Sequence, residues 1–84
     1  MIVKVQHFKK EVLGVWEEEI YANVERVYKF RDLVEDEFLH LKIKGQENME
    51  LVPITHIDEE GNHQSLVGCV WLMNDEGKTI EKLV

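Results

Sequence analysis

The chain has very little cysteine or proline, with one residue of each among its 84 residues. The single cysteine, Cys69, excludes a disulfide within the chain and fits a reducing compartment. No hydrophobic run approaches the roughly 20 residues that a transmembrane helix requires. The N-terminal residues alternate between apolar and polar and lack the apolar core of a signal peptide. We therefore expect one small domain, residues 1–84, in the cytoplasm and away from the membrane.

The chain also has fewer positively charged residues than negatively charged ones. The chain carries 17 Asp and Glu residues against 10 Lys and Arg residues, a formal net charge of −7. This balance disfavours direct binding to DNA, RNA or anionic membranes, because phosphate binding draws on Lys and Arg. Lys42 and Lys44 beside Lys9 and Lys10 form one candidate basic patch, although a solvated sheet edge is the simpler interpretation.

The clearest pattern lies in residues 38–57, where two segments of alternating apolar residues flank the loop 45–48. The pattern predicts two antiparallel strands joined by a Gly-containing connection. With that loop, Lys44 lies opposite Met49. A register shift of one residue would turn the apolar side chains of one strand to the other face, so the pattern favours this register.

Two later segments, 58–62 and 74–78, resemble each other, with acidic or amide residues followed by glycine at the fourth position. Both suit a type I turn followed by a glycine in the left-handed region. Together with the first loop they predict a four-stranded antiparallel meander over residues 38–84. One face of this meander gathers apolar residues from all its strands: Leu39, Leu41, Ile43, Val52, Ile54, Leu66, Val70, Leu72 and Ile80.

The opposite face of the predicted meander is also partly apolar, with Leu51, Val67, Cys69, Trp71, Met73 and Leu83. A strand that is apolar on both sides is usually covered on both sides. Either residues 1–37 or a second copy of the chain must then cover this face. Leu51, Val67, Trp71 and Met73 are the candidate interface residues, and a homodimer is a reasonable expectation.

The N-terminal third is harder to interpret. Residues 2–8 alternate and predict a strand, and strands also suit residues 20–31. For residues 9–19 we expect a turn followed by a short strand. A four-residue spacing of apolar side chains across 9–23 keeps a helix as the alternative. The expected fold is therefore mainly β, a small antiparallel meander that is curled or barrel-like, with an α+β fold containing one N-terminal helix as the alternative.

Residues that could carry chemistry do not form a recognisable motif. None of the four histidines has the close spacing of a typical zinc site. Cys69 lies in an apolar run, where burial keeps a thiol inert, and Gly68 beside it marks a bulge or a close packing contact. The sequence contains no nucleophile elbow or phosphate-binding loop. We therefore predict no catalytic, metal-ligating or cofactor-binding residue and no enzymatic activity.

Acidic residues occur in three groups: Glu17, Glu18 and Glu19; Glu35, Asp36 and Glu37; and Asp58, Glu59 and Glu60. Their simplest role is to solvate turns and strand ends. A contiguous acidic face without Lys or Arg would instead imitate nucleic-acid phosphates, as some small acidic phage proteins do. The sequence thus leaves two hypotheses. The favoured one is a non-enzymatic protein-interaction or assembly module, whose partner is another protein or itself. The alternative is an acidic inhibitor of a DNA- or RNA-binding protein.

Overall fold

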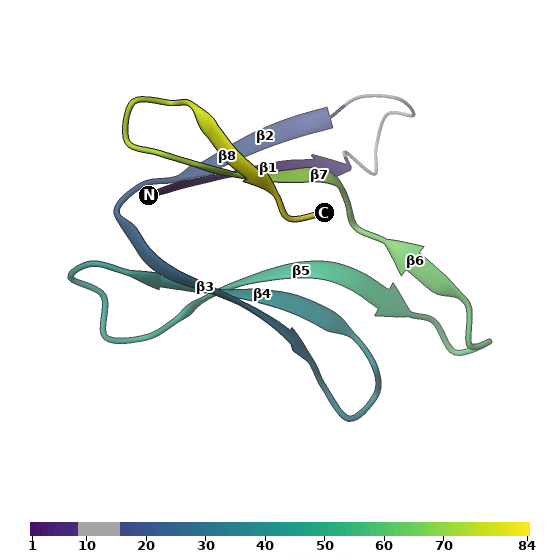
Figure 1. Cartoon of the computed structure of the whole chain (residues 1–84). Coiled ribbons are helices and arrows are strands. Elements are labelled where there is room, and N and C mark those ends of the chain that lie inside the picture. Colours follow the sequence, from purple (N-terminus) through teal and green to yellow (C-terminus); the bar gives the residue numbers. More distant parts are fainter. Residues whose placement is uncertain (9–15) are drawn as a thin grey trace.

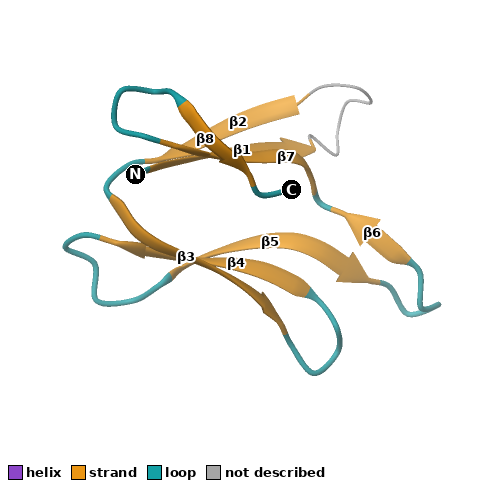
Figure 2. Cartoon of the chain, viewed as in Figure 1, coloured by secondary structure: helices purple, strands orange, loops and turns teal. Residues whose placement is uncertain are grey.

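The computed structural model describes residues 1–8 and 16–84, which form eight strands in two antiparallel sheets (Figures 1 and 2). The strands are β1 Ile2–Phe8, β2 Trp16–Tyr21, β3 Val24–Arg31, β4 Glu37–Ile43, β5 Glu50–Ile57, β6 His63–Ser65, β7 Val67–Met73 and β8 Thr79–Lys82. One sheet, called the β1 sheet, has the order β2-β1-β7-β8. The other, called the β4 sheet, has the order β3-β4-β5-β6.

The prediction of a mainly β, antiparallel protein is confirmed. The described residues contain no helix, and so none that is long and apolar enough to span a membrane. The helix alternative is wrong for 16–21, because these residues pair along β1 from Trp16 opposite Phe8 to Tyr21 opposite Val3. The remainder of that prediction, residues 9–15, lies outside the described residues, as do Lys9 and Lys10 of the candidate basic patch.

One core cluster lies between the inner faces of the two sheets, and Figure 1 shows the sheets as two layers. Its buried members are Val3, Val5, Val24, Leu39, Leu41, Ile43, Val52, Ile54, Val67 and Val70. Most of the apolar face predicted from 38–84 is therefore correct. Ile80 is the exception and is exposed, because an irregularity in the β7–β8 pairing sets Leu72 opposite Glu81.

The predicted hairpin 38–57 forms, but its register differs by two residues. Leu39 lies opposite Val52, and Leu41 opposite Glu50. The connection is longer than predicted and spans 44–49, since Gln46 N–H donates to Ile43 O at 3.1 Å and forms a tight turn at the start. A shift of two residues preserves which side chains face the core, so the predicted face survives the wrong register.

The strand predicted across 63–73 instead divides between the two sheets. β6 pairs with β5 in the predicted register, Thr55 opposite Ser65, whereas β7 pairs with β1 in the other sheet. The meander therefore splits into two layers and does not curl as one sheet. Between the pairs Val5–Val70 and His7–Val67 the register shifts by one residue, at Gly68 and Cys69. This bulge resets the alternation and buries Val67, so its assignment to the opposite face was wrong.

Candidate functional site

The outer face of the β4 sheet carries a continuous set of aromatic and apolar side chains. Tyr28 lies opposite His40, and His40 lies opposite Leu51 on the next strand. Leu39 and Leu41 on either side of His40 are buried, so the alternation of side chains directs this row away from the core. We call the whole set the aromatic face; it comprises Arg26, Tyr28, Phe30, Phe38, His40, Lys42, Leu51 and Pro53.

Much of the aromatic face is open to solvent. Tyr28 and Phe30 are each 47% exposed, and Leu51 is 53% exposed. The Phe30 and His40 rings pack against each other with centroids 4.9 Å apart and planes tilted by 44°. The exposed surface therefore crosses three adjacent strands, β3, β4 and β5, without interruption.

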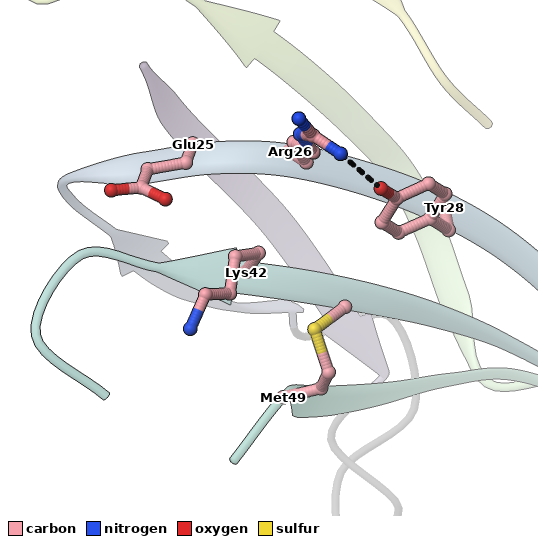
Figure 3. A pocket seen from close by; sticks show the side chains of 5 residues that line it. All are labelled: Glu25, Arg26, Tyr28, Lys42 and Met49. Carbon is pink, nitrogen blue, oxygen red and sulfur yellow. Dashed lines mark hydrogen bonds between the residues drawn. The ribbon is translucent and has the colours of Figure 1, made fainter. Parts of the chain in front are cut away.

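Two shallow hollows lie beside exposed rings of the aromatic face, one on that face and one at the edge where Lys29, Arg31 and Glu37 of the opposite face begin. The larger, of about 350 Å³, is lined by Glu25, Arg26, Tyr28, Lys42 and Met49 (Figure 3). In it, Arg26 Nη1 donates a hydrogen bond of 3.2 Å to the Tyr28 hydroxyl. The smaller, of about 280 Å³, is lined by Lys29, Phe30, Arg31 and Glu37. Each hollow combines an aromatic ring with two cations and one carboxylate, which suits binding more than bond-breaking chemistry.

The turn that joins β3 to β4 extends this surface with two apolar side chains. Leu33 is fully exposed, and Val34 is largely exposed. The turn is held by Asp32, whose Oδ1 accepts hydrogen bonds of 3.0 Å from the N–H groups of Val34 and Asp36. Glu35 N–H donates to the Asp32 carbonyl at 3.0 Å. The tip is therefore well ordered by hydrogen bonds, yet it presents apolar groups to water.

This turn has the same hydrogen bonds as the two turns that the sequence did predict. In turns 58–62 and 74–78 the first side chain likewise accepts from the third and fifth N–H groups. Gly61 and Gly77 hold the fourth position with φ of 83° and 85°, where Glu35 has a φ of 66°. Residues 31–37 were expected to connect two strands, but the turn type was not predicted because the segment lacks glycine; its Asp at the first position was the available signal. A non-glycine residue at positive φ is strained, and such strain often accompanies function.

The acidic residues after this turn are engaged in bonds within the β4 sheet. Asp36 Oδ1 accepts from Ile57 N–H at 2.9 Å, and Asp36 Oδ2 lies 3.3 Å from His56 Nδ1. The Ile57 bond, followed by the His56 contact, lowers the pKa of Asp36. Arg31 pairs with Glu37 and, with a smaller contribution from Lys29, lowers the pKa of that carboxyl.

The other acidic groups are divided between different surfaces. On β2, Glu18 Oε2 lies 3.4 Å from Lys4 Nζ, and Glu19 Oε2 lies 2.9 Å from His7 Nε2. Asp58 caps its own turn, and the Asn62 and Glu60 N–H bonds lower its pKa. Glu17, Glu59 and Glu60 are exposed. Because Lys4, Lys29 and Arg31 are interspersed with these groups, the geometry does not favour an acidic face that imitates nucleic acid.

The four candidate interface residues do not come together. Val67 is in the core, and Leu51 belongs to the aromatic face. Trp71 and Met73 lie on β7 in the other sheet, where Lys4 Nζ is 5.4 Å from the Trp71 ring centroid. Across residues 1–8 and 16–84, no three His, Cys, Asp or Glu side chains form a cluster that could hold a metal ion.

Comparison with family models, curated proteins and solved structures finds no significant match. Arguments about function therefore rest on the geometry of the aromatic face and the β3–β4 turn. Of their residues, the sequence pattern singled out Leu51 and Lys42 on the face and Glu35 and Asp36 in the turn, each for a different role.

Proposed function

We propose that this chain is a non-enzymatic protein-interaction module that binds its partner through the aromatic face and the tip of the β3–β4 turn. One observation carries the proposal. Of the eight large hydrophobic side chains that are exposed among the described residues, five lie on β3, the β3–β4 turn and β5. They are Tyr28, Phe30, Leu33, Val34 and Leu51. Exposed apolar residues gathered in this way are typical of protein-binding surfaces.

The composition of the surface supports a protein as the partner. Binding interfaces are enriched in aromatic residues and Arg, and such residues often contribute most of the binding energy. Here Tyr28 and Arg26 are already joined by a hydrogen bond, which holds both side chains in place. Each hollow also combines two cations with one carboxylate, Glu25 or Glu37. The partner is therefore expected to offer apolar groups together with carboxylates.

Site-specific photocrosslinking in the native host tests the proposal. A photoreactive phenylalanine analogue at Phe30 should crosslink to a discrete polypeptide, while the same analogue at Glu81, exposed on the other sheet, should not. The captured protein is then purified and its affinity measured with each variant. Tyr28→Ala and Leu33→Ala should each weaken binding about tenfold or more, which corresponds to a residue of high binding energy.

The matched control is Ile20→Ala, since Ile20 is exposed on β2, outside the proposed surface. It should leave the affinity unchanged. Equal crosslinking from Phe30 and Glu81, or an affinity that depends on Ile20 and not on Tyr28, would contradict the proposal.

A further inference from the structure

The β3 strand forms one edge of the β4 sheet and has an unpaired side. Asp32 N–H donates to Asp36 O at 3.0 Å, and this pair continues the register of Phe30 with Phe38. In an antiparallel ladder, residues that bond to the neighbouring strand alternate with residues that do not. The N–H and C=O groups of Val27, Lys29 and Arg31 are therefore directed away from β4.

At its beginning, this same edge already binds another segment of chain. Val24 N–H donates to Met1 O at 2.8 Å, and the Met1 amino group donates to Val24 O at 3.0 Å. Beyond Val24, no described strand pairs along the open side of β3. The edge therefore offers the backbone groups of residues 27–31 to an additional strand, of the kind that sheet-extending peptides use.

The side chains beside this edge specify the chemistry of that strand. On the outer face an added residue would lie next to Tyr28 or Phe30, which favours apolar groups. On the other face it would lie next to Lys29 or Arg31. Glu37 is the carboxylate that pairs with both cations, with Lys29 Nζ at 4.0 Å from Glu37 Oε2. Glu35 attracts Arg31 more weakly, so Lys29 has the weaker pairing of the two. Acidic side chains therefore fit at these alternate positions.

We infer that a partner protein adds an extended segment, in which apolar residues alternate with Asp or Glu, to the open edge of β3 as a fifth strand of the β4 sheet. This inference rests on the proposed protein-interaction function and identifies the class of partner. Backbone hydrogen bonds to 27–31 supply the pairing, and the alternating side chains supply the specificity. Phe30 and Tyr28 would then pack against the apolar side chains of the added strand on the outer face of the sheet.

A second copy of this chain fits the edge less well. Pairing β3 with another β3 would place Arg26, Lys29 and Arg31 of one copy close to the same three cations of the other. Glu25 is the single carboxylate within the strand. Like charges on facing strands are destabilising, so the charge pattern favours an acidic partner over self-association.

A labelled peptide in which Val alternates with Glu is the probe, and a peptide in which Val alternates with Lys is its control. Binding is measured by fluorescence anisotropy, and amide hydrogen exchange locates the protected groups. The Val/Glu peptide should bind about tenfold or more tightly than the Val/Lys peptide and should protect the amides of Val27, Lys29 and Arg31. No binding, or equal binding of both peptides, would overturn the inference.

Lys29→Pro is the decisive variant, because it removes an N–H group that points away from β4. The β3–β4 ladder loses no bond, and edge strands tolerate proline at such positions. It should weaken peptide binding about tenfold, whereas Lys29→Ala, which removes the charged side chain but keeps the N–H group, should have a smaller effect. A circular-dichroism melt checks that both variants fold.

The outcomes separate this inference from the proposed function. If the protein captured at Phe30 binds Lys29→Pro and the unmodified chain equally, strand addition is wrong but the protein-interaction module stands. If Phe30 captures no protein, the proposed function fails as well. A dimer detected by light scattering that Lys29→Pro dissociates would show that a second copy occupies the edge, and would overturn the acidic-partner inference.

Discussion

The outer faces of the two sheets differ in how their aromatic residues are covered. On the β1 sheet, the Lys4 ammonium lies 5.4 Å from the Trp71 ring centroid and 3.4 Å from Glu18, so one cation covers the ring and is itself neutralised. On the β4 sheet, Tyr28 and Phe30 remain 47% exposed. The β4 sheet supplies six of the ten buried core residues and the β1 sheet four, so the exposure of the β4 outer face is not a consequence of poor packing within the fold.

The exposed apolar residues of the β1 sheet do not weaken this contrast. Ile20 is on β2 and Ile80 is on β8, the opposite edges of the sheet order β2-β1-β7-β8. Single exposed apolar residues are normal on protein surfaces. On the β4 sheet they occupy adjacent strands and the turn between them. The candidate binding surface is therefore distinguished by exposed apolar residues that lie next to one another, more than by their number.

Truncating one aromatic residue on each face is the strongest test of this contrast. Trp71→Ala should lower the free energy of unfolding by about 2–3 kcal/mol, less than for a fully buried Trp, because the side chain is only partly buried. Phe30→Ala should change it by less than about 1 kcal/mol, as for other surface positions. Urea denaturation measures both. Equal losses would show that the aromatic face is structural and would remove the main reason to treat it as a binding surface.

The turns provide the next comparison, because one of the three related turns lacks glycine. Gly77→Ala, in the β1 sheet, should cost about 1–2 kcal/mol, since a side chain at φ 85° is strained. Glu35→Gly, in the β4 sheet, should relieve the same strain and raise stability by about 1 kcal/mol. Thermal denaturation measures both changes. If Glu35→Gly destabilises the chain, the carboxyl has a structural role that its hydrogen bonds do not indicate.

The cation above Trp71 has a smaller predicted effect. Lys4→Met should keep the aliphatic part of the side chain and lose the attraction to the ring, at a cost of about 0.5–1 kcal/mol. Lys42→Met, on the aromatic face, should cost less, because Lys42 bonds only to the exposed Gln46 carbonyl at 2.8 Å. A greater loss from Lys42→Met would show that the cation on the β4 face is the more important for stability.

The sequence predicted the fold better than it predicted the site, and for a physical reason. Alternation identifies which side chains share a face, and it tolerated a two-residue error in the β4–β5 register. The bulge at Gly68 was expected, but the crossing of the chain from the β4 sheet to the β1 sheet between Ser65 and Val67 was not, because strand partners are set by contacts distant in sequence. Because this change of sheet was not predicted, Leu51 and Trp71 were assigned to one face although they lie in different sheets.

The aromatic face was missed because its residues were assigned to other roles. An aromatic side chain on a strand, such as Tyr28, is most simply a core or sheet residue, so the sequence alone does not mark it as exposed. Whether a second face is covered depends on the layer opposite it, which alternation within one strand does not reveal. The type of the β3–β4 turn was not predicted, although a connection was expected there, because Glu35 holds the position that glycine holds in the other two turns.

The last comparison concerns turns 58–62 and 74–78, which have the same hydrogen bonds but begin with Asp58 and Asn74. The bonds from Asn62 and Glu60 lower the pKa of Asp58 below its ordinary value of 3.8, so the carboxylate favours the folded state. This contribution is complete above the unfolded pKa and is lost as the pH falls through the lower, folded pKa. Asn74 has no such titration.

Asp58→Asn should therefore leave stability nearly unchanged at neutral pH, because an amide oxygen can accept the same two backbone bonds. It should reduce the loss of stability as the pH falls below about 4. Asn74→Asp should do the reverse and add a pH dependence of the same sign to the β1 sheet. Urea denaturation at pH values from about 6 to 3 measures both variants. If Asp58→Asn leaves the pH dependence unchanged, then Asp36 and Glu37, whose pKa values are also lowered, account for it, and acid sensitivity belongs to the β3–β4 turn that carries the exposed Leu33.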